Sequence, residues 1–304
     1  MNPNKNVRRL GLIMALTCFA SIHPRVMADP QLMGGMVQKP KPDFKDRVVT
    51  FNSPDGVTVV GDYYPLRVES GQLSPAVILI HMYPKNRASW KAFAGQLRDK
   101  GMSVLAYDIR GNGDSVKPES LKLAEGYKSK TPAHFQNASL DVMGALDFLR
   151  QLEYIDMSRV ALVGASIGCS ISLDAATRTN DIRGIVCLSP GVDYFGVDSL
   201  SHIKTCASYT PILLLSPEGE FEAVQKLAEA GGAKVETGKY EGGREYHGTN
   251  LLDAPYGKKV NKRITKFVKK VLSIAEPAKK DAKDKKDGKT KKSGGKKKSK
   301  DAHP

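Results

Sequence analysis

Hydrophobic positions along the 304 residues follow two different periods. Short continuous apolar runs are typical of strands buried on both faces, whereas apolar residues three and four apart predict helices. Separated by turns rich in Gly, Pro, Asn and Asp, these runs predict eight strands. The strands are expected at residues 47–51, 57–64, 75–80, 102–107, 160–163, 184–188, 211–215 and 233–240.

Helical segments are predicted between most of these strands and after the last one, at residues 90–100, 134–152, 169–176, 221–230 and 260–274. The first two strands are close enough to form an antiparallel hairpin. The later alternation of strands and helices predicts a mainly parallel sheet with helices on both faces, which is the α/β class. Residues 189–210 are expected to form a loop, so only a minimal cap is expected above the sheet.

The central apolar strand is followed directly by the pattern G-x-S-x-G at residues 164–168. This pattern also occurs by chance in a chain with 28 Gly. Here, however, a buried strand precedes it and a helix-compatible run with small residues follows it. Strand, sharp turn and helix in that order describe a nucleophile elbow, which exposes a serine hydroxyl beside the free N–H groups of a helix N-terminus. We therefore predict that Ser166 is a nucleophile.

Charge is concentrated at the two ends of the chain. The formal net charge is +15, but residues 1–28 contribute +4, residues 277–304 contribute +8, and the middle is close to balance. The high pI therefore gives no argument for a fold that binds nucleic acid specifically. With 40% hydrophobic residues, the middle has enough apolar side chains to form a core.

The N-terminal segment has the pattern of an export signal. Basic residues at 5, 8 and 9 precede an apolar stretch at 10–22, and small residues lead up to Ala28. We predict a signal peptide at 1–28 cleaved after Ala28, with a retained membrane anchor as the alternative. A linker is expected at 29–44 and the folded domain at 45–275. The protein is expected to be exported, to the periplasm or beyond.

Residues 276–304 are predicted to be a disordered Lys-rich tail, because they contain twelve Lys and almost no apolar side chains. Adhesion to an anionic cell-envelope surface is one interpretation, and a solvating tail is the other. The tail has no Arg and no aromatic residue, which disfavours nucleic acid. Three Cys remain after the signal segment, and they are interpreted as buried thiols. No spacing of Cys or His suggests a metal site, and no cofactor is expected.

Three further motifs accompany the elbow. One is His81-Met82-Tyr83-Pro84, similar to H-G-x-P; another runs from Asp108 to Ser115, similar to D-x-R-G-x-G-x-S; the third is Tyr-His-Gly-Thr at 246–249. Together they resemble the α/β-hydrolase superfamily, particularly exported small esterases and its serine-aminopeptidase-like and dienelactone-hydrolase-like branches. The resemblance covers about residues 45–275. Met82 departs from the usual Gly, and the available acid is Glu rather than Asp.

The resemblance implies a catalytic triad in the chain order Ser, acid, His. His247 is the one histidine between the last predicted strand and the tail, and we expect it to be the general base. Glu218 and Glu220 follow the seventh strand. We favour Glu220, because the acid usually comes after a Gly-containing turn, with Glu218 as the alternative and Asp193 as a more distant one.

The oxyanion hole is expected to use two backbone N–H groups, those of Ile167 and Tyr83, with Met82 as the alternative to Tyr83. His81 is interpreted as shaping its loop, and Asp108, Arg110 and Asp114 as structural residues. Tyr83, Tyr194, Phe195 or Tyr209 are candidates for an apolar acyl pocket.

These features predict a serine hydrolase, of the carboxylesterase kind, acting on a small-molecule ester or acyl substrate. A peptidase or amidase and an acyltransferase are alternatives on the same triad. A binding protein without catalytic activity on the same fold is the alternative outside enzymes. The sequence does not indicate the oligomeric state.

Overall fold

The eight long strands of the computed structural model lie in one sheet, in the order β1-β2-β4-β3-β5-β6-β9-β10. The structure describes residues 42–116 and 121–274. β1 pairs with β2 and β2 with β4 in antiparallel fashion, and every other pairing is parallel. This confirms the predicted α/β class and its antiparallel opening. The strands are β1 (Arg47–Asn52), β2 (Thr58–Tyr64), β3 (Ser74–Ile80), β4 (Ser103–Tyr107), β5 (Ile155–Ala165), β6 (Ile182–Leu188), β9 (Ile212–Pro217) and β10 (Val235–Tyr240).

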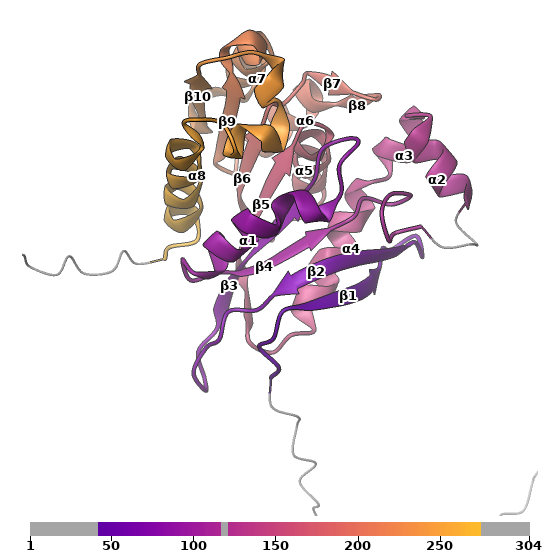
Figure 1. Cartoon of the computed structure of the whole chain (residues 1–304), viewed down its shortest axis with the longest axis vertical. Helices are drawn as coiled ribbons and strands as arrows, with labels where there is room; N and C mark the ends of the chain where they lie inside the picture. Colours follow the sequence, from indigo (N-terminus) through magenta and orange to yellow (C-terminus); the bar gives the residue numbers. More distant parts are fainter. Residues whose placement is uncertain (1–41, 117–120, 275–304) are drawn as a thin grey trace, which may run out of the picture. The chain divides into compact units, whose positions relative to one another are not determined.

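The two faces of the sheet are covered by different helices (Figure 1). α1 (Lys91–Arg98) and α8 (Gly257–Val271) cover one face; α4 (Ser139–Arg150), α5 (Ile167–Arg178), α6 (Ser199–Cys206) and α7 (Phe221–Gly231) cover the other. Side chains alternate between the faces along each strand. In β3, for example, Val77 and Leu79 pack toward α1 and α8, whereas Ile78 and Ile80 pack toward α4 and α5. The central strands therefore need apolar residues at every position.

Several short elements differ from the sequence expectation. α2 (Leu121–Lys128) lies where no helix was expected, and the single helix expected at 134–152 is divided into α3 (Pro132–Gln136) and α4. Residues 189–210 are not a simple loop, because they form the hairpin β7 (Asp193–Tyr194) and β8 (Val197–Asp198) and then α6. Asp198 caps α6 by accepting from the Ser201 N–H at 3.1 Å. The 3₁₀ turns are η2 (Arg87–Trp90), η4 (Glu218–Glu220), η5 (Gly232–Lys234), η6 (Arg244–Tyr246) and η7 (Gly248–Leu252).

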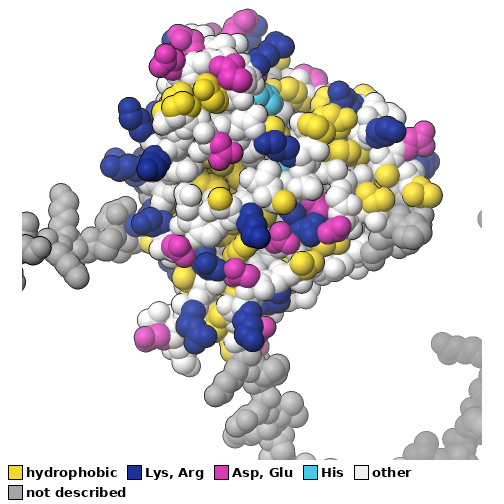
Figure 2. Space-filling model, viewed as in Figure 1, with side chains coloured by type: hydrophobic (Ala, Val, Ile, Leu, Met, Phe, Trp, Pro, Cys, Tyr) yellow, Lys and Arg dark blue, Asp and Glu magenta, His cyan; other side chains and the backbone are white. Residues whose placement is uncertain are grey.

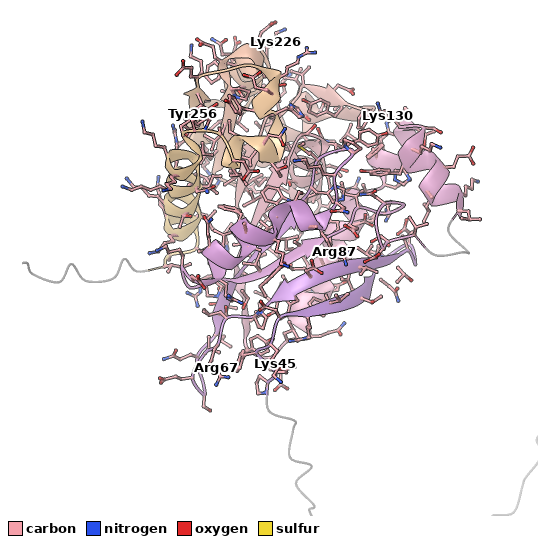
Figure 3. The ribbon with its side chains drawn as sticks, viewed as in Figure 1. Lys45, Arg67, Arg87, Lys130, Lys226 and Tyr256 are labelled. Atoms are coloured by element: carbon pink, nitrogen blue, oxygen red, sulfur yellow. The ribbon has the colours of Figure 1, made fainter. Side chains whose placement is uncertain are left out.

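Two ion-pair networks, each including one fully buried carboxylate, fix the loop after β4. Arg87 binds Asp62 at 2.9 Å and Asp114 at 2.6 Å, and its guanidinium also contacts the fully buried Asp108. Figure 3 labels Arg87 where these loops meet. These contacts agree with the prediction that Asp108 and Asp114 are structural residues.

The second network joins the same loop to α4. The buried Arg110 binds Asp55 at 2.7 Å and Asp141 at 2.9 Å. Burial raises the pKa of Asp141 to about 6 in spite of this partner. Arg110 thus also acts as a structural residue.

The three cysteines of the described region, Cys169, Cys187 and Cys206, are buried and free, as expected. No helix within 42–116 or 121–274 is long and apolar enough to cross a membrane. The predicted signal peptide (1–28), most of the predicted linker (29–44) and the predicted tail (276–304) lie outside the described residues.

Candidate active site

Ser166 stands on a sharp turn between the C-terminal end of β5 and the start of α5. Its backbone has φ +53° and ψ −120°, a conformation that non-Gly residues rarely adopt and that costs on the order of 1–3 kcal/mol. The two flanking glycines make the turn possible. A Cβ on Gly164 would lie 2.2 Å from the Gly168 carbonyl oxygen, and a Cβ on Gly168 would lie 2.3 Å from that of Ile80. Strand, turn and helix therefore pack too closely for any side chain at these positions.

Backbone bonds to neighbouring strands hold this turn in place. The Ser166 N–H donates to the Leu188 carbonyl at 2.9 Å, and the Cys169 thiol contacts the carbonyls of Gly164 and Leu188 at 3.3 Å. Burial raises the pKa of Cys169 well above its usual value, so this thiol stays protonated and serves as a donor. Rigid anchoring of this kind offsets the strain at Ser166.

His247 and Glu220 form a hydrogen-bonded pair. Both Glu220 carboxylate oxygens lie 2.9 Å from His247 Nδ1. Glu220 comes from η4 after β9, and His247 from the loop after β10, so the pair joins the two loops that the sequence places after the last two strands. Side-chain exposures of 16% for Glu220 and 24% for His247 leave the contact only partly solvated.

The two alternative acids lie elsewhere. Glu218 is 62% exposed and pairs with Lys239 at 2.9 Å. Asp193 is also exposed, and its carboxylate accepts from the Gly196 N–H at 2.9 Å within the β7–β8 hairpin. Neither carboxylate contacts His247, so of the three acids considered from sequence only Glu220 meets the histidine.

The loop after β3 is shaped by His81, as expected. Its Nε2 accepts from the Ile109 N–H at 3.0 Å, which leaves Nδ1 to donate to the Met82 carbonyl at 2.9 Å. Complete burial lowers the pKa of His81 to about 4, so the ring is neutral. Because the C=O and N–H of one trans peptide point in opposite directions, fixing the Met82 carbonyl turns the Tyr83 N–H away from His81.

The two N–H groups expected to form an oxyanion hole are available as donors. Within residues 42–116 and 121–274, neither the Tyr83 N–H nor the Ile167 N–H has a protein acceptor. Ile167 is the first residue of α5, where an unpaired N–H also carries the positive end of the helix dipole.

Met82, which departs from the family pattern, connects this loop to the histidine loop. The Thr249 N–H lies 3.4 Å and the Thr249 hydroxyl 3.6 Å from the Met82 sulfur. Gly248 has φ +58°, and a Cβ there would lie 2.4 Å from the same sulfur. The methionine therefore fills the space that Gly248 leaves open and packs against the residue next to His247.

Two residues near the site carry roles that the sequence reasoning did not assign. Ser189, at the end of β6 with φ +53°, accepts from the Gly248 N–H through its hydroxyl at 2.9 Å. Its carbonyl accepts from the Tyr194 hydroxyl at 3.3 Å. The position of Ser189 directly after a buried strand, level with the elbow, is the signal that was available in the sequence.

Tyr194 lies near both Ser166 and His247. Its ring stands edge-on to the His247 ring with centroids 6.4 Å apart. Burial is the main cause that raises the pKa of Tyr194 to about 12; nearby Glu220 raises it further, and the neighbouring Ser166 hydroxyl lowers it. No hydrogen bond joins Ser166 to His247 within the described part of the chain, but Tyr194 adjoins both residues.

An aromatic wall borders the Tyr83 loop. Tyr83 packs against Tyr127 and Phe195 with ring centroids 5.1 and 5.6 Å apart, and Lys130 Nζ lies 4.8 Å from the Tyr83 ring centroid. Figure 3 labels Lys130 beside α2 and α3. Tyr209, another candidate for an acyl pocket, is not part of this wall. Its hydroxyl donates to the Ala176 carbonyl near the far end of α5 from Ser166.

A cavity of about 680 Å³ opens beside the His247–Glu220 pair. Tyr194, Val192 and Ala223 form part of its wall, together with the cations Arg244 and Lys226, the latter labelled on α7 in Figure 3. Ser166 is not among its lining residues. Within residues 42–116 and 121–274, no cluster of three His, Cys, Asp or Glu side chains is arranged to hold a metal ion.

Comparison with known proteins agrees with this fold. A family model described as the alpha/beta hydrolase fold matches residues 75–214, from β3 through the elbow to β9. The chain therefore has the α/β-hydrolase fold. Among solved structures, this hydrolase-fold chain is similar to a Pyrococcus furiosus esterase, with a TM-score of 0.60, 17% identity, and coverage of 75% of this chain and 92% of the esterase.

Two further similarities extend over part of the other protein. The Pyrococcus horikoshii acylaminoacyl peptidase gives a TM-score of 0.58 at 16% identity, covering 78% of this chain and 43% of the peptidase. An uncharacterised Mycobacterium tuberculosis protein is 27% identical over 133 residues, which is 43% of this chain. The match spans only 41% of that relative. These likenesses establish the fold.

Proposed function

We propose that this α/β-hydrolase-fold protein is a serine hydrolase that cleaves carboxylic esters through an acyl-enzyme on Ser166. The observation that carries the proposal is the strained backbone of Ser166 at an elbow whose surroundings include a histidine held by a carboxylate. Strain of this kind persists where the surrounding structure enforces it, commonly at functional sites. Similarity to an esterase fold supports the same reading.

In the proposed mechanism, Ser166 Oγ attacks the ester carbonyl carbon while His247 Nε2 accepts the hydroxyl proton. The carbonyl oxygen becomes an oxyanion that accepts from the N–H groups of Ile167 and Tyr83. Collapse of this intermediate breaks the bond to the alcohol, which leaves with the proton from His247. Water then attacks the acyl carbon, again giving its proton to His247, and the carboxylic acid leaves as Ser166 recovers its hydrogen.

Glu220 contributes through His247. Its carboxylate lies 2.9 Å from Nδ1, so it keeps the proton on that nitrogen and leaves Nε2 free to act as the base. When Nε2 takes the serine proton, the carboxylate stabilises the resulting imidazolium. In this mechanism glutamate fills the role usually taken by aspartate.

A fluorophosphonate probe tests the nucleophile. We expect covalent labelling of the wild type, none of Ser166→Ala, and unchanged labelling of the control Ser208→Ala, which alters an exposed serine in the turn after α6. Absence of labelling in a wild type with normal circular dichroism would favour a binding protein without catalytic activity and would sink the proposal.

A substrate panel then separates the alternatives on the same triad. Short- and long-chain p-nitrophenyl esters, aminoacyl anilides and an alcohol acceptor distinguish an esterase from a peptidase or amidase and from an acyltransferase. We expect ester turnover well above anilide turnover. Export through residues 1–28 and adhesion through the Lys-rich tail remain predictions from the sequence.

A further inference from the structure

The outward face of α8 carries five exposed lysines: Lys258, Lys259, Lys262, Lys266 and Lys270. At about 100° per residue they fall within an arc of roughly 120°, and at about 1.5 Å per residue they extend along roughly 18 Å of helix. The helix contains no acidic residue. Figure 2 shows Lys and Arg side chains gathered along the left edge of the view, where Figure 1 places α8. We call these five residues the lysine face.

The fold does not require this face. The opposite side of α8 supplies the core contacts through Val260, Ile264, Phe267 and Val268, all of them buried. The single arginine of the helix, Arg263, donates to the Thr237 carbonyl of β10 and so belongs to the packed side. Any polar residues on the outward side would leave these contacts unchanged.

The lysine face also works against the stability of the helix. Lys258 and Lys259 lie in the first turn, where the helix dipole disfavours cations, and no acidic residue there compensates. Lys258, Lys262, Lys266 and Lys270 follow one another at four-residue spacing, which places like charges side by side. Lys270 binds Glu236 at 3.2 Å, but within the described residues the other four lysines have no carboxylate partner. Because core packing does not need the lysine face and the helix is not stabilised by it, these charges point to an interaction with a ligand.

We propose that the lysine face docks onto the surface of an anionic lipid bilayer. Lysines provide point charges, which suit the negative charge spread over the headgroups of a bilayer surface. Specific recognition of a single phosphate typically uses the planar guanidinium of arginine instead. The face presents no exposed aromatic residue on which a nucleobase stacks. A straight, rigid line of charges also fits a flat surface. The sequence continues after the helix with twelve more Lys in residues 277–304, again without Arg or aromatic residues.

The test compares two triple variants of the full chain that change net charge equally. Lys258→Gln, Lys262→Gln and Lys266→Gln together remove three of the five lysines of the face. The control combines Lys122→Gln, Lys128→Gln and Lys204→Gln, which alter exposed lysines on α2 and α6. Partitioning onto phosphatidylcholine vesicles with and without phosphatidylglycerol is measured by sedimentation over a series of salt concentrations.

We expect the wild type and the control to bind the vesicles that contain phosphatidylglycerol within about twofold of each other at low salt. Each lysine withdrawn from an anionic leaflet lowers partitioning by roughly fivefold, so the α8 variant should bind about 100-fold more weakly. The wild type and the control should both dissociate from the vesicles at high salt, because salt screens the attraction between the lysines and the anionic headgroups. Thermal unfolding should show no loss of stability in the α8 variant, because the substitutions relieve repulsion.

Three results would overturn the proposal. Equal losses in the two triple variants would mean that net charge or the tail, rather than the lysine face, governs binding. Equal binding to vesicles with and without phosphatidylglycerol would exclude an anionic-surface site. Binding to duplex DNA that the α8 substitutions weaken, without an effect on vesicles, would assign the face to nucleic acid instead.

Discussion

Replacing Glu220 with Gln removes one negative charge from the His247 pair and almost no volume. The two carboxylate oxygens lie 2.9 Å from Nδ1, and both side chains are mostly buried. At about 3 Å and an effective dielectric constant of about 20, the ion pair that forms when His247 is protonated is worth roughly 5 kcal/mol. Partial exposure and solvent reorganisation reduce this to about 2–4 kcal/mol, which corresponds to a roughly 30- to 1000-fold loss in kcat.

Glu218→Gln is the matched control, because it makes the same chemical change two residues away. Glu218 is 62% exposed and binds Lys239 rather than His247. We expect its kcat to stay within about twofold of the wild type, since exposed pairs contribute little. The assay is saturation kinetics on a short-chain p-nitrophenyl ester, with circular dichroism of each variant as the folding check. The assignment of Glu220 fails if its variant keeps kcat within about threefold, or if Glu218→Gln costs more.

Three further outcomes are expected. Burial lowers the pKa of His134 to about 4 in the folded state, so below pH 6.5 the histidine is protonated in the unfolded chain before it is protonated in the folded one. The free energy of unfolding therefore falls between pH 7 and pH 5. In urea titrations His134→Gln should make that fall about 2 kcal/mol smaller than in the wild type. Gly168→Ala should lower the free energy of unfolding by about 2 kcal/mol or more and abolish activity, because the new Cβ would meet the Ile80 backbone. Gly95→Ala is the control: it has open space around it in α1 and should raise the free energy of unfolding by about 0.5–1 kcal/mol. Met82→Leu keeps the bulk but loses the sulfur acceptor, so kcat should fall about tenfold at nearly constant KM; an unchanged kcat would show that Met82 serves packing alone.

The central strands and helices were predictable because each obeys one local rule. β3 from Pro75 onward and the second half of β5, from Val160 onward, are apolar runs, and α8 repeats apolar residues at helical spacing. α2 and α6 escaped prediction because they are short, and α6 is stabilised by a cap at Asp198 and by packing on α5. Such elements depend on contacts that no local pattern displays.

For the candidate site, motif order located Ser166 and His247, but it did not decide which glutamate meets the histidine. Glu218 and Glu220 are two residues apart, and the 3₁₀ turn η4 directs one toward solvent and the other toward His247. The position of Met82 was visible as a departure from the family pattern. Its contact with Thr249 was not, because it joins residues 167 positions apart in the chain.

The residues of the candidate site come from two distant parts of the sequence, and this has a consequence for biosynthesis. The elbow, including its anchor at Leu188, and the Tyr83 loop are complete once β6 has been made, whereas Glu220 and His247 follow β9 and β10. A chain interrupted between these points would carry the proposed nucleophile without a base and would be inert toward esters. Reactivity would then appear only when synthesis is nearly finished, and Met82 would find its partner at Thr249 in the same late step.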